Sequence, residues 1–397
     1  MQALNEKIER NQERFMILFC LRNFLQPKGC ALKSALEGKS FSDLDWNFII
    51  HVTTIHRILP FFSLALFENG QLSKIPPLFQ GLLKENLNQG VMQNLVKRVE
   101  FKKVHEIFEK ERIAILPLKG VALTHEIYSE TPVRQMGDVD LLIHEKDLGM
   151  AKKLLCENGF ELKEGFNRWQ TPLTDSLLGR SGYWRGGLDV DLQWRPRFVF
   201  GGNSIEWDAV GAWQRASPCP SLGENVFLLT PEDNARYLLF QICNDWEAKR
   251  LFWVQLLDLA AVLRKNQMDI GELSRISSKN LPVASAKKLE LFECLLKECF
   301  FEEKDYGEFS WESREVIDYL FNHLPIVLDG FSGKSFLEGT SSISDKLIFL
   351  LGYLFPSRWL VRNQYGKGPA AFLRACLDHW KRLFLKFFQL VSGRPRL

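Results

Sequence analysis

The sequence has no apolar run of the roughly 20 residues that a membrane-spanning helix requires. Its uncharged stretches at 58–67 and 347–357 reach only about half that length. The opening residues, MQALNEKIERNQER, carry charges of both signs and lack the basic-then-apolar order of a secretory signal. We therefore expect a cytoplasmic protein without a transmembrane segment.

Cysteine pairs with the C-x-x-C spacing are also absent. The eight cysteines are scattered, and no histidines stand near them at zinc-finger spacing. In a chain of 397 residues this favours reduced, packed thiols over a disulfide framework. Internal repeats and low-complexity segments are missing too. The composition, 46% apolar and 25% charged, excludes a disordered or collagen-like chain.

An excess of charge of one sign occurs only near the C-terminus. The whole chain has a net charge of +3, but residues 353–397 contain nine Lys and Arg against one acidic residue. Within them, 372–391 has the spacing of an amphipathic helix with a basic face. Its apolar face is expected to pack on the protein, the alternative being peripheral contact with an anionic membrane. No base-reading module accompanies it, so nucleic acid is not an expected partner.

The pattern of the chain changes at about residue 111. Residues 1–110 and 226–397 place apolar side chains at intervals of three and four, as packed helices do. Between them, 111–225 has short strand-like runs separated by helical ones. The strand-like runs are 113–118, 138–144 and 186–194, the helical ones are 121–129 and 148–160, and 179–187 has the glycine and serine of a loop. We predict an α+β fold, with a small mixed sheet flanked by N-terminal and C-terminal helical regions.

Two pairs of aspartates stand in the strand-like runs. Alternate side chains of a strand share a face, so Asp138 and Asp140 project together, as do Asp189 and Asp191. Converging carboxylates on a sheet are typical of a Mg²⁺ site, because Mg²⁺ binds carboxylates, substrate phosphates and water. The D-x-D pattern alone is a modest signal, since it also arises by chance at strand ends.

Basic residues and a glycine near these aspartates indicate a phosphate site. Lys119 and Gly120 stand between a predicted strand and a predicted helix, where backbone N–H groups favour anions. Arg134, four residues before Asp138, could balance triphosphate charge, although an ion pair with a neighbouring acid is equally consistent. Asp258 lies among apolar residues of a predicted helix, which predicts a buried pairing with a basic residue.

Taken together, these motifs resemble a known family. The runs LPLKGVAL at 116–123 and PVRQMGDVDLLI at 132–143 are similar to those of the uncharacterised bacterial nucleotidyltransferase family of the DNA polymerase β-like superfamily. The similarity continues through Val-Asp-Leu-Gln-Trp at 190–194, where members tend to have Asp-Leu-His-Trp. It extends to 253–259 and, more loosely, to Phe-Pro-Ser at 355–357.

The resemblance implies metal-dependent transfer of a nucleoside monophosphate from an NTP to a hydroxyl group. ATP is the expected donor, Mg²⁺ or Mn²⁺ the expected cofactor, and the acceptor is an unidentified small molecule, peptide or protein. By the same resemblance, the catalytic, metal-binding carboxylates would be Asp138, Asp140 and Asp191, with Asp189 as the alternative third acid, and the nucleotide would be held by Lys119, Gly120, Arg134 and Gly137.

The sequence departs from the family pattern at two positions. Val121 replaces the serine that usually follows the glycine, so Lys119 or Thr124 would have to substitute for its hydroxyl. Gln193 replaces the histidine after the third acid and removes a titratable group. These departures are the reason to keep a second, alternative function, a catalytically attenuated nucleotide-binding module that acts through protein partners.

Overall fold

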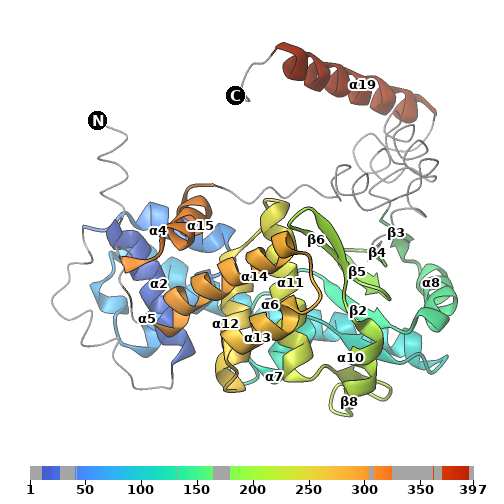
Figure 1. Cartoon of the computed structure of the whole chain (residues 1–397), viewed down its shortest axis with the longest axis horizontal. Coiled ribbons are helices and arrows are strands. Elements are labelled where there is room, and N and C mark those ends of the chain that lie inside the picture. Colours follow the sequence, from blue (N-terminus) through green and yellow to red (C-terminus); the bar gives the residue numbers. More distant parts are fainter. Residues whose placement is uncertain are drawn as a thin grey trace.

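The computed structural model describes residues 11–26, 41, 43–131, 133–163, 179–302, 304, 308–323, 361 and 369–392. Over these ranges the chain has an α+β fold, with a small mixed sheet and helices before and after it in sequence (Figure 1), which confirms the predicted fold class. None of the helices in these ranges is long and apolar enough to span a membrane.

A five-stranded sheet forms the centre of the middle region. Its strands are β1 (Ile115–Pro117), β2 (Val139–Ile143), β3 (Glu161–Leu162), β4 (Arg180–Arg185) and β5 (Leu188–Gln193). Their order is β1-β2-β5-β4-β3. The β2–β5 pair is parallel and the other three pairs are antiparallel, so the two aspartate-bearing strands lie side by side and run in the same direction.

The prediction of a loop at 179–187 was wrong, because most of this segment is strand β4, which pairs with β5. Gly186 and Gly187 make the tight turn between the two strands and have φ angles of +56° and +92°. Two successive positive φ angles are what a two-residue hairpin turn requires, so the glycine pair was a hairpin signal. Gly182 within the strand obscured the alternating pattern.

The two faces of the sheet have different partners. The face of Val139, Leu141 and Val190 packs against α6 (Pro77–Glu109) and α8 (Leu148–Glu157) in one hydrophobic cluster. The opposite face carries the aspartates and, at Leu142, joins the larger core that includes α11 (Pro231–Glu247) and α12 (Trp253–Lys265). Strand alternation therefore places the aspartates toward the C-terminal helices.

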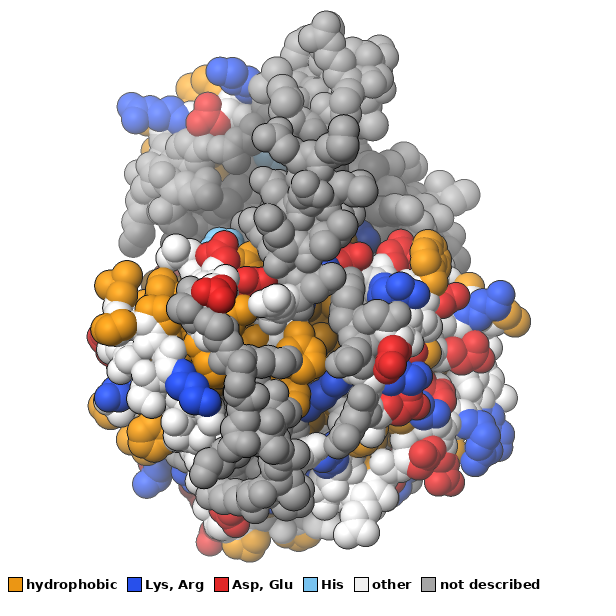
Figure 2. Space-filling model, turned by 90° about the vertical axis from the view of Figure 1, so that its left-hand side faces the viewer, with side chains coloured by type: hydrophobic (Ala, Val, Ile, Leu, Met, Phe, Trp, Pro, Cys, Tyr) orange, Lys and Arg blue, Asp and Glu red, His pale blue; other side chains and the backbone are white. Residues whose placement is uncertain are grey.

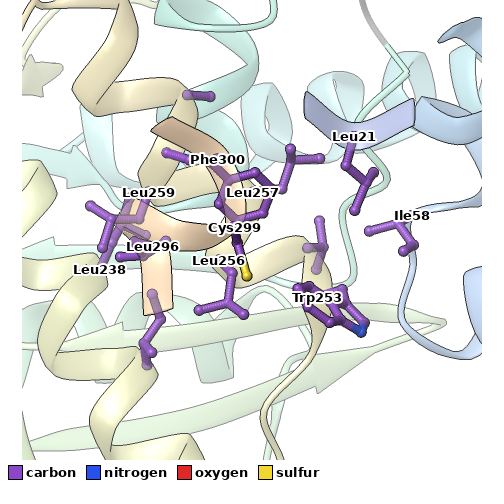
Figure 3. Packing of buried hydrophobic residues seen from close by; sticks show 14 of the residues in the cluster. Leu21, Ile58, Leu238, Trp253, Leu256, Leu257, Leu259, Leu296, Cys299 and Phe300 are labelled. Atoms are coloured by element: carbon purple, nitrogen blue, oxygen red, sulfur yellow. The ribbon is translucent and has the colours of Figure 1, made fainter. Parts of the chain in front are cut away.

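Helices from the two ends of the chain share that larger core. Figure 3 shows Leu21 and Ile58 near Trp253 of α12 and beside the packed leucines of the C-terminal helices. Arg14 also forms an ion pair with Asp318 at 2.6 Å. The helical regions predicted at 1–110 and 226–397 therefore pack on each other as well as beside the sheet.

The remaining elements complete these layers. Thr230 caps α11 by accepting a hydrogen bond from the backbone of Asp233, and Pro231 occupies the first turn. The uncharged stretch at 347–357, with its Phe-Pro-Ser motif, lies outside the described residues. The other helices are α2 (Asn11–Leu25), α4 (Trp46–Ile55), α5 (Leu59–Glu68), α7 (Gly120–Glu126), α10 (Ala209–Arg215), α13 (Ile270–Ser278), α14 (Val283–Leu296), the π-helix η3 (Lys297–Phe301), α15 (Trp311–Asn322) and α19 (Pro369–Ser392), the short 3₁₀ helices are η1 (Leu72–Lys74) and η2 (Glu145–Asp147), and the short strands are β6 (Arg197–Phe200), β7 (Asn203–Glu206), β8 (Ser217–Pro218) and β9 (Phe227–Leu228).

The C-terminal helix α19 forms as predicted, but its apolar face is only partly buried. Cys376 is buried, whereas Phe372 and Trp380 of the same face are 41% and 45% exposed. On the face of the molecule seen in Figure 2, described Lys, Arg, Asp and Glu side chains are interspersed with hydrophobic ones. Among the described residues, Ala375 of α19 clusters with Val361 and not with the larger core, so the expected packing of this helix on the protein stays a prediction.

Candidate active site

Two aspartates on neighbouring strands form the centre of the site. Asp140 of β2 and Asp191 of β5 are direct partners in the parallel register. Asp140 is buried, Asp191 is half-buried, and Asp138 is exposed just before β2 begins. Asp189 lies on the same face but forms an ion pair with Lys163 at 2.7 Å. Of the two candidates for third carboxylate, Asp191 is the one beside Asp140.

The aspartates repel one another. Burial, followed by the negative charge of Asp138, raises the pKa of Asp140 to about 7, and Asp191 adds to this rise. The ammonium group of Lys119 acts in the opposite direction and lowers this pKa. The site therefore places three carboxylates close enough for their charges to interact, with Lys119 as the cation that bonds to Asp140.

Lys119 provides that internal cation. Its Nζ donates to Oδ1 of Asp140 at 2.8 Å. Burial opposes the charge of Lys119, but the surrounding carboxylates outweigh this effect and raise its pKa well above the usual value. Its backbone has a φ of +47°, a conformation that is strained for a residue with a Cβ atom. Such strain indicates that the surrounding structure fixes the position of this lysine.

The free energy of unfolding of Lys119→Gly is expected to be about 1 kcal/mol higher than that of Lys119→Ala. Both variants lose the ammonium group, but only glycine removes the backbone strain. Urea denaturation would measure the difference. Lys153, on the exposed surface of α8, provides the control, because there glycine is expected to be less stable than alanine by a similar amount. Equal stability of the two Lys119 variants would contradict the assignment of strain.

Gly120 allows close packing behind the site. A Cβ atom at this position would lie 3.0 Å from Cγ of Met136 and 3.3 Å from Nη1 of Arg134. A larger residue would push the 134–136 segment away from α7. Gly137, by contrast, is exposed beside Asp138. Of the two glycines predicted to hold the nucleotide, Gly120 packs against the 134–136 segment and Gly137 follows that segment directly before Asp138.

Arg134 forms its ion pair with Asp258 of α12 and not with a carboxylate of the site. It is buried and binds both carboxylate oxygens of Asp258, with Nη2 at 2.7 Å from Oδ2 and Nε at 2.9 Å from Oδ1. The hydroxyl of Tyr128 donates to the same carboxylate at 3.0 Å. The ion pair that the sequence left open is therefore present, and the predicted pairing of Asp258 is confirmed. This arrangement anchors the segment before Asp138 to α12.

Three further polar residues lie at the carboxylates: Gln193, which the sequence singled out without a role, and Arg180 and Tyr237, which were missed from the sequence. Arg180 of β4 places Nη1 3.8 Å from Oδ2 of Asp191. Gln193 bonds to both central aspartates, and Tyr237 of α11 bonds to Gln193. Arg180 was missed because β4 was predicted as a loop. Tyr237 is 46 residues beyond Asp191 in the chain, and no local pattern connects the two.

The structure also shows what stands at the first departure from the family pattern. Val121 is buried in the core behind the sheet. The hydroxyl of Thr124 donates to the backbone carbonyls of Gly120 and Val121 within its own helix. Of the two residues that could substitute for the missing serine, only Lys119 reaches the carboxylates.

The donor set suits a hard divalent cation, since Asp138, Asp140 and Asp191 offer carboxylate oxygens only. Within the described ranges no three His, Cys, Asp or Glu side chains are arranged to hold a metal as they stand. Oδ1 of Asp140 accepts hydrogen bonds from Lys119 and Gln193 instead. Joint metal binding by the three aspartates therefore requires a rearrangement in which Lys119 takes a new partner and the cation uses Oδ2 of Asp140 and Oδ1 of Asp191, the oxygens that Gln193 does not hold.

Comparison with known proteins adds an independent finding. Residues 42–297 match the model of a family described as uncharacterised nucleotidyltransferase. Neither the curated proteins nor the solved structures yield a match to this chain. The matched span contains the sheet, all three aspartates, Lys119 and the helices that cover them. The chain therefore belongs to the uncharacterised nucleotidyltransferase family, and an NTP is its implied substrate.

Proposed function

We propose that the protein transfers a nucleoside monophosphate, with ATP as the expected donor, to a hydroxyl group of a small-molecule, peptide or protein acceptor, in a reaction that depends on Mg²⁺ or Mn²⁺. The observation that carries this proposal is the side-by-side placement of Asp140 and Asp191, with Asp138 and Lys119 next to them. The motifs at 116–123 and 132–143 favour placing the family in the DNA polymerase β-like superfamily.

The roles follow from charge and position. Asp138, Asp140 and Asp191 would hold the divalent cation, which would neutralise phosphate charge and orient the phosphate. With a cation held at Asp140, Lys119 would be available to contact the polyphosphate instead of Asp140. Arg180 is the second cation available, because it lies at the carboxylates while Arg134 is bound to Asp258. Catalysis of this kind depends on positioning and charge neutralisation.

Calorimetric titration with each NTP, with and without Mg²⁺ or Mn²⁺, tests the proposal. The parent protein is expected to bind an NTP only with the metal, and Asp138→Asn is expected to bind at least about tenfold more weakly. Asp138 is exposed, so this change should leave the fold intact. Asp189→Asn is the matched control, since Asp189 lies on the same face but is paired with Lys163, and it should bind as the parent does.

Two outcomes would contradict the proposed transfer reaction. Failure of the parent to bind any NTP would exclude the proposed site. Metal-dependent binding with no transfer to any component of a cell extract would instead support the attenuated module that acts through protein partners.

A further inference from the structure

We propose that Gln193 and Tyr237 are positioning residues that hold Asp140 and Asp191 side by side for the divalent cation. This inference rests on the proposed function, because it concerns the same carboxylates. It assigns a role to the residue that replaces the family's histidine, and it makes α11 part of the active site.

A single amide group bridges the two strands. Nε2 of Gln193 donates to Oδ1 of Asp140 at 3.2 Å and to Oδ2 of Asp191 at 3.0 Å. A primary amide has two N–H hydrogens, so each carboxylate can receive its own. Hydrogen bonds to charged groups are stronger than those between neutral groups. The amide therefore draws together two carboxylates that otherwise repel each other.

The orientation of the amide is determined by its other end. The hydroxyl of Tyr237 donates to Oε1 of Gln193 at 3.0 Å. The reverse orientation would place the carbonyl oxygen of the amide against both carboxylates, where it could only repel them. Gln193 is 1% exposed, so water has little access to compete for these bonds. Tyr237 thus directs the two N–H groups toward the aspartates.

The position of Tyr237 is itself determined by packing. Its ring is flanked edge-on by Phe198 and Trp207, each with a centroid distance of 5.3 Å. Both neighbours are buried, and such aromatic contacts have a specific geometry. Helix α11 thereby fixes the spacing of Asp140 and Asp191, which belong to strands β2 and β5.

Mn²⁺ binding measures this role without any acceptor. Gln193→Leu is expected to bind Mn²⁺ at least about tenfold more weakly than the parent, a loss typical of residues that orient metal ligands. Tyr237→Phe keeps the packed ring and removes only the hydroxyl, so a smaller loss of about threefold is expected. Gln193→His keeps an N–H donor and should recover much of the affinity lost in Gln193→Leu.

Gln71→Leu is the matched control for general destabilisation. Gln71 is buried, and its amide donates to the backbone carbonyl of Asn69, outside the site. This variant should bind Mn²⁺ as the parent does, even if it unfolds at a lower urea concentration.

The outcomes separate this inference from the proposed function. Weakened Mn²⁺ binding in Gln193→Leu and Tyr237→Phe, with Gln71→Leu unchanged, supports the positioning role. Parent-like binding in both site variants overturns this inference and leaves the proposed function standing. Absence of Mn²⁺ binding in the parent, with or without NTP, overturns both.

Discussion

Asp140→Asn is expected to lower the rate of nucleotide transfer by about a hundredfold to a thousandfold, the effect of removing one charge-stabilising group from a preorganised site. Asparagine has nearly the same shape but cannot supply the negative charge that a divalent cation requires. The measurement is incorporation of the labelled α-phosphate of ATP into components of a cell extract. Gln71→Leu serves as the control, and a rate within tenfold of the parent would contradict the role of Asp140.

The pH dependence of the free energy of unfolding shows whether the Asp140→Asn variant is folded and tests the raised pKa of Asp140. The pKa of Asp140 is raised in the folded protein from 3.8 to about 7, mainly by burial. A raised pKa means that the folded state binds more protons in this range, so the stability of the metal-free parent falls as the pH rises from about 4 to 7. Asp140→Asn lacks this contribution. Its stability relative to the parent should therefore increase over the same range, and the opposite slope would argue against the raised pKa.

Asp258→Ala is expected to lower the free energy of unfolding by about 3–5 kcal/mol, the largest stability effect that we predict. The change leaves the guanidinium of Arg134 buried without its partner and also removes the acceptor of the Tyr128 hydroxyl. Urea denaturation followed by circular dichroism would measure the loss. Asp318→Ala is the control, since Asp318 is partly exposed where it pairs with Arg14. It should cost less.

A double variant tests whether the unpaired charge causes the loss. Arg134→Met combined with Asp258→Leu replaces the ion pair by apolar groups, which is often neutral or stabilising when a pair is buried. We expect it to be more stable than Asp258→Ala. If the double variant were equally unstable, the cost would lie in packing at α12. Because Arg134 anchors the segment before Asp138, the double variant should also bind Mn²⁺ more weakly than the parent.

Much of the site follows from local pattern in the sequence. Strand alternation places Asp138 with Asp140 and Asp189 with Asp191, and the structure puts Asp140 and Asp191 on neighbouring strands. The predicted strands and helices between residues 113 and 160 are also present. These features depend on neighbours in the sequence, so a period of two or of 3.6 residues reveals them.

The choice between partners did not follow from the sequence. Arg134 is four residues from Asp138 in the chain, yet it binds Asp258, 124 residues away. Tyr237 reaches the carboxylates through Gln193 from a helix whose own pattern indicates only packing. Such contacts depend on how the helices dock on the sheet, which periodicity does not encode. Arg180 was missed for a simpler reason. It lies on strand β4, which was not predicted because Gly182 interrupts the alternating pattern of that strand.

The core shared by the two ends of the chain has a consequence for folding during synthesis. Arg14 and Asp318 are separated by 304 residues, so α2 emerges from the ribosome long before its partners exist. At about 5–20 residues per second, the delay is roughly 15–60 s. During that time the part of α2 that packs on α12 and η3 lacks its native cover, although α4 and α5 follow α2 closely in the chain. The aspartate-bearing face can be covered only after α11 and α12 have been synthesised, so a nascent chain that ends before them leaves this face of the sheet open to solvent.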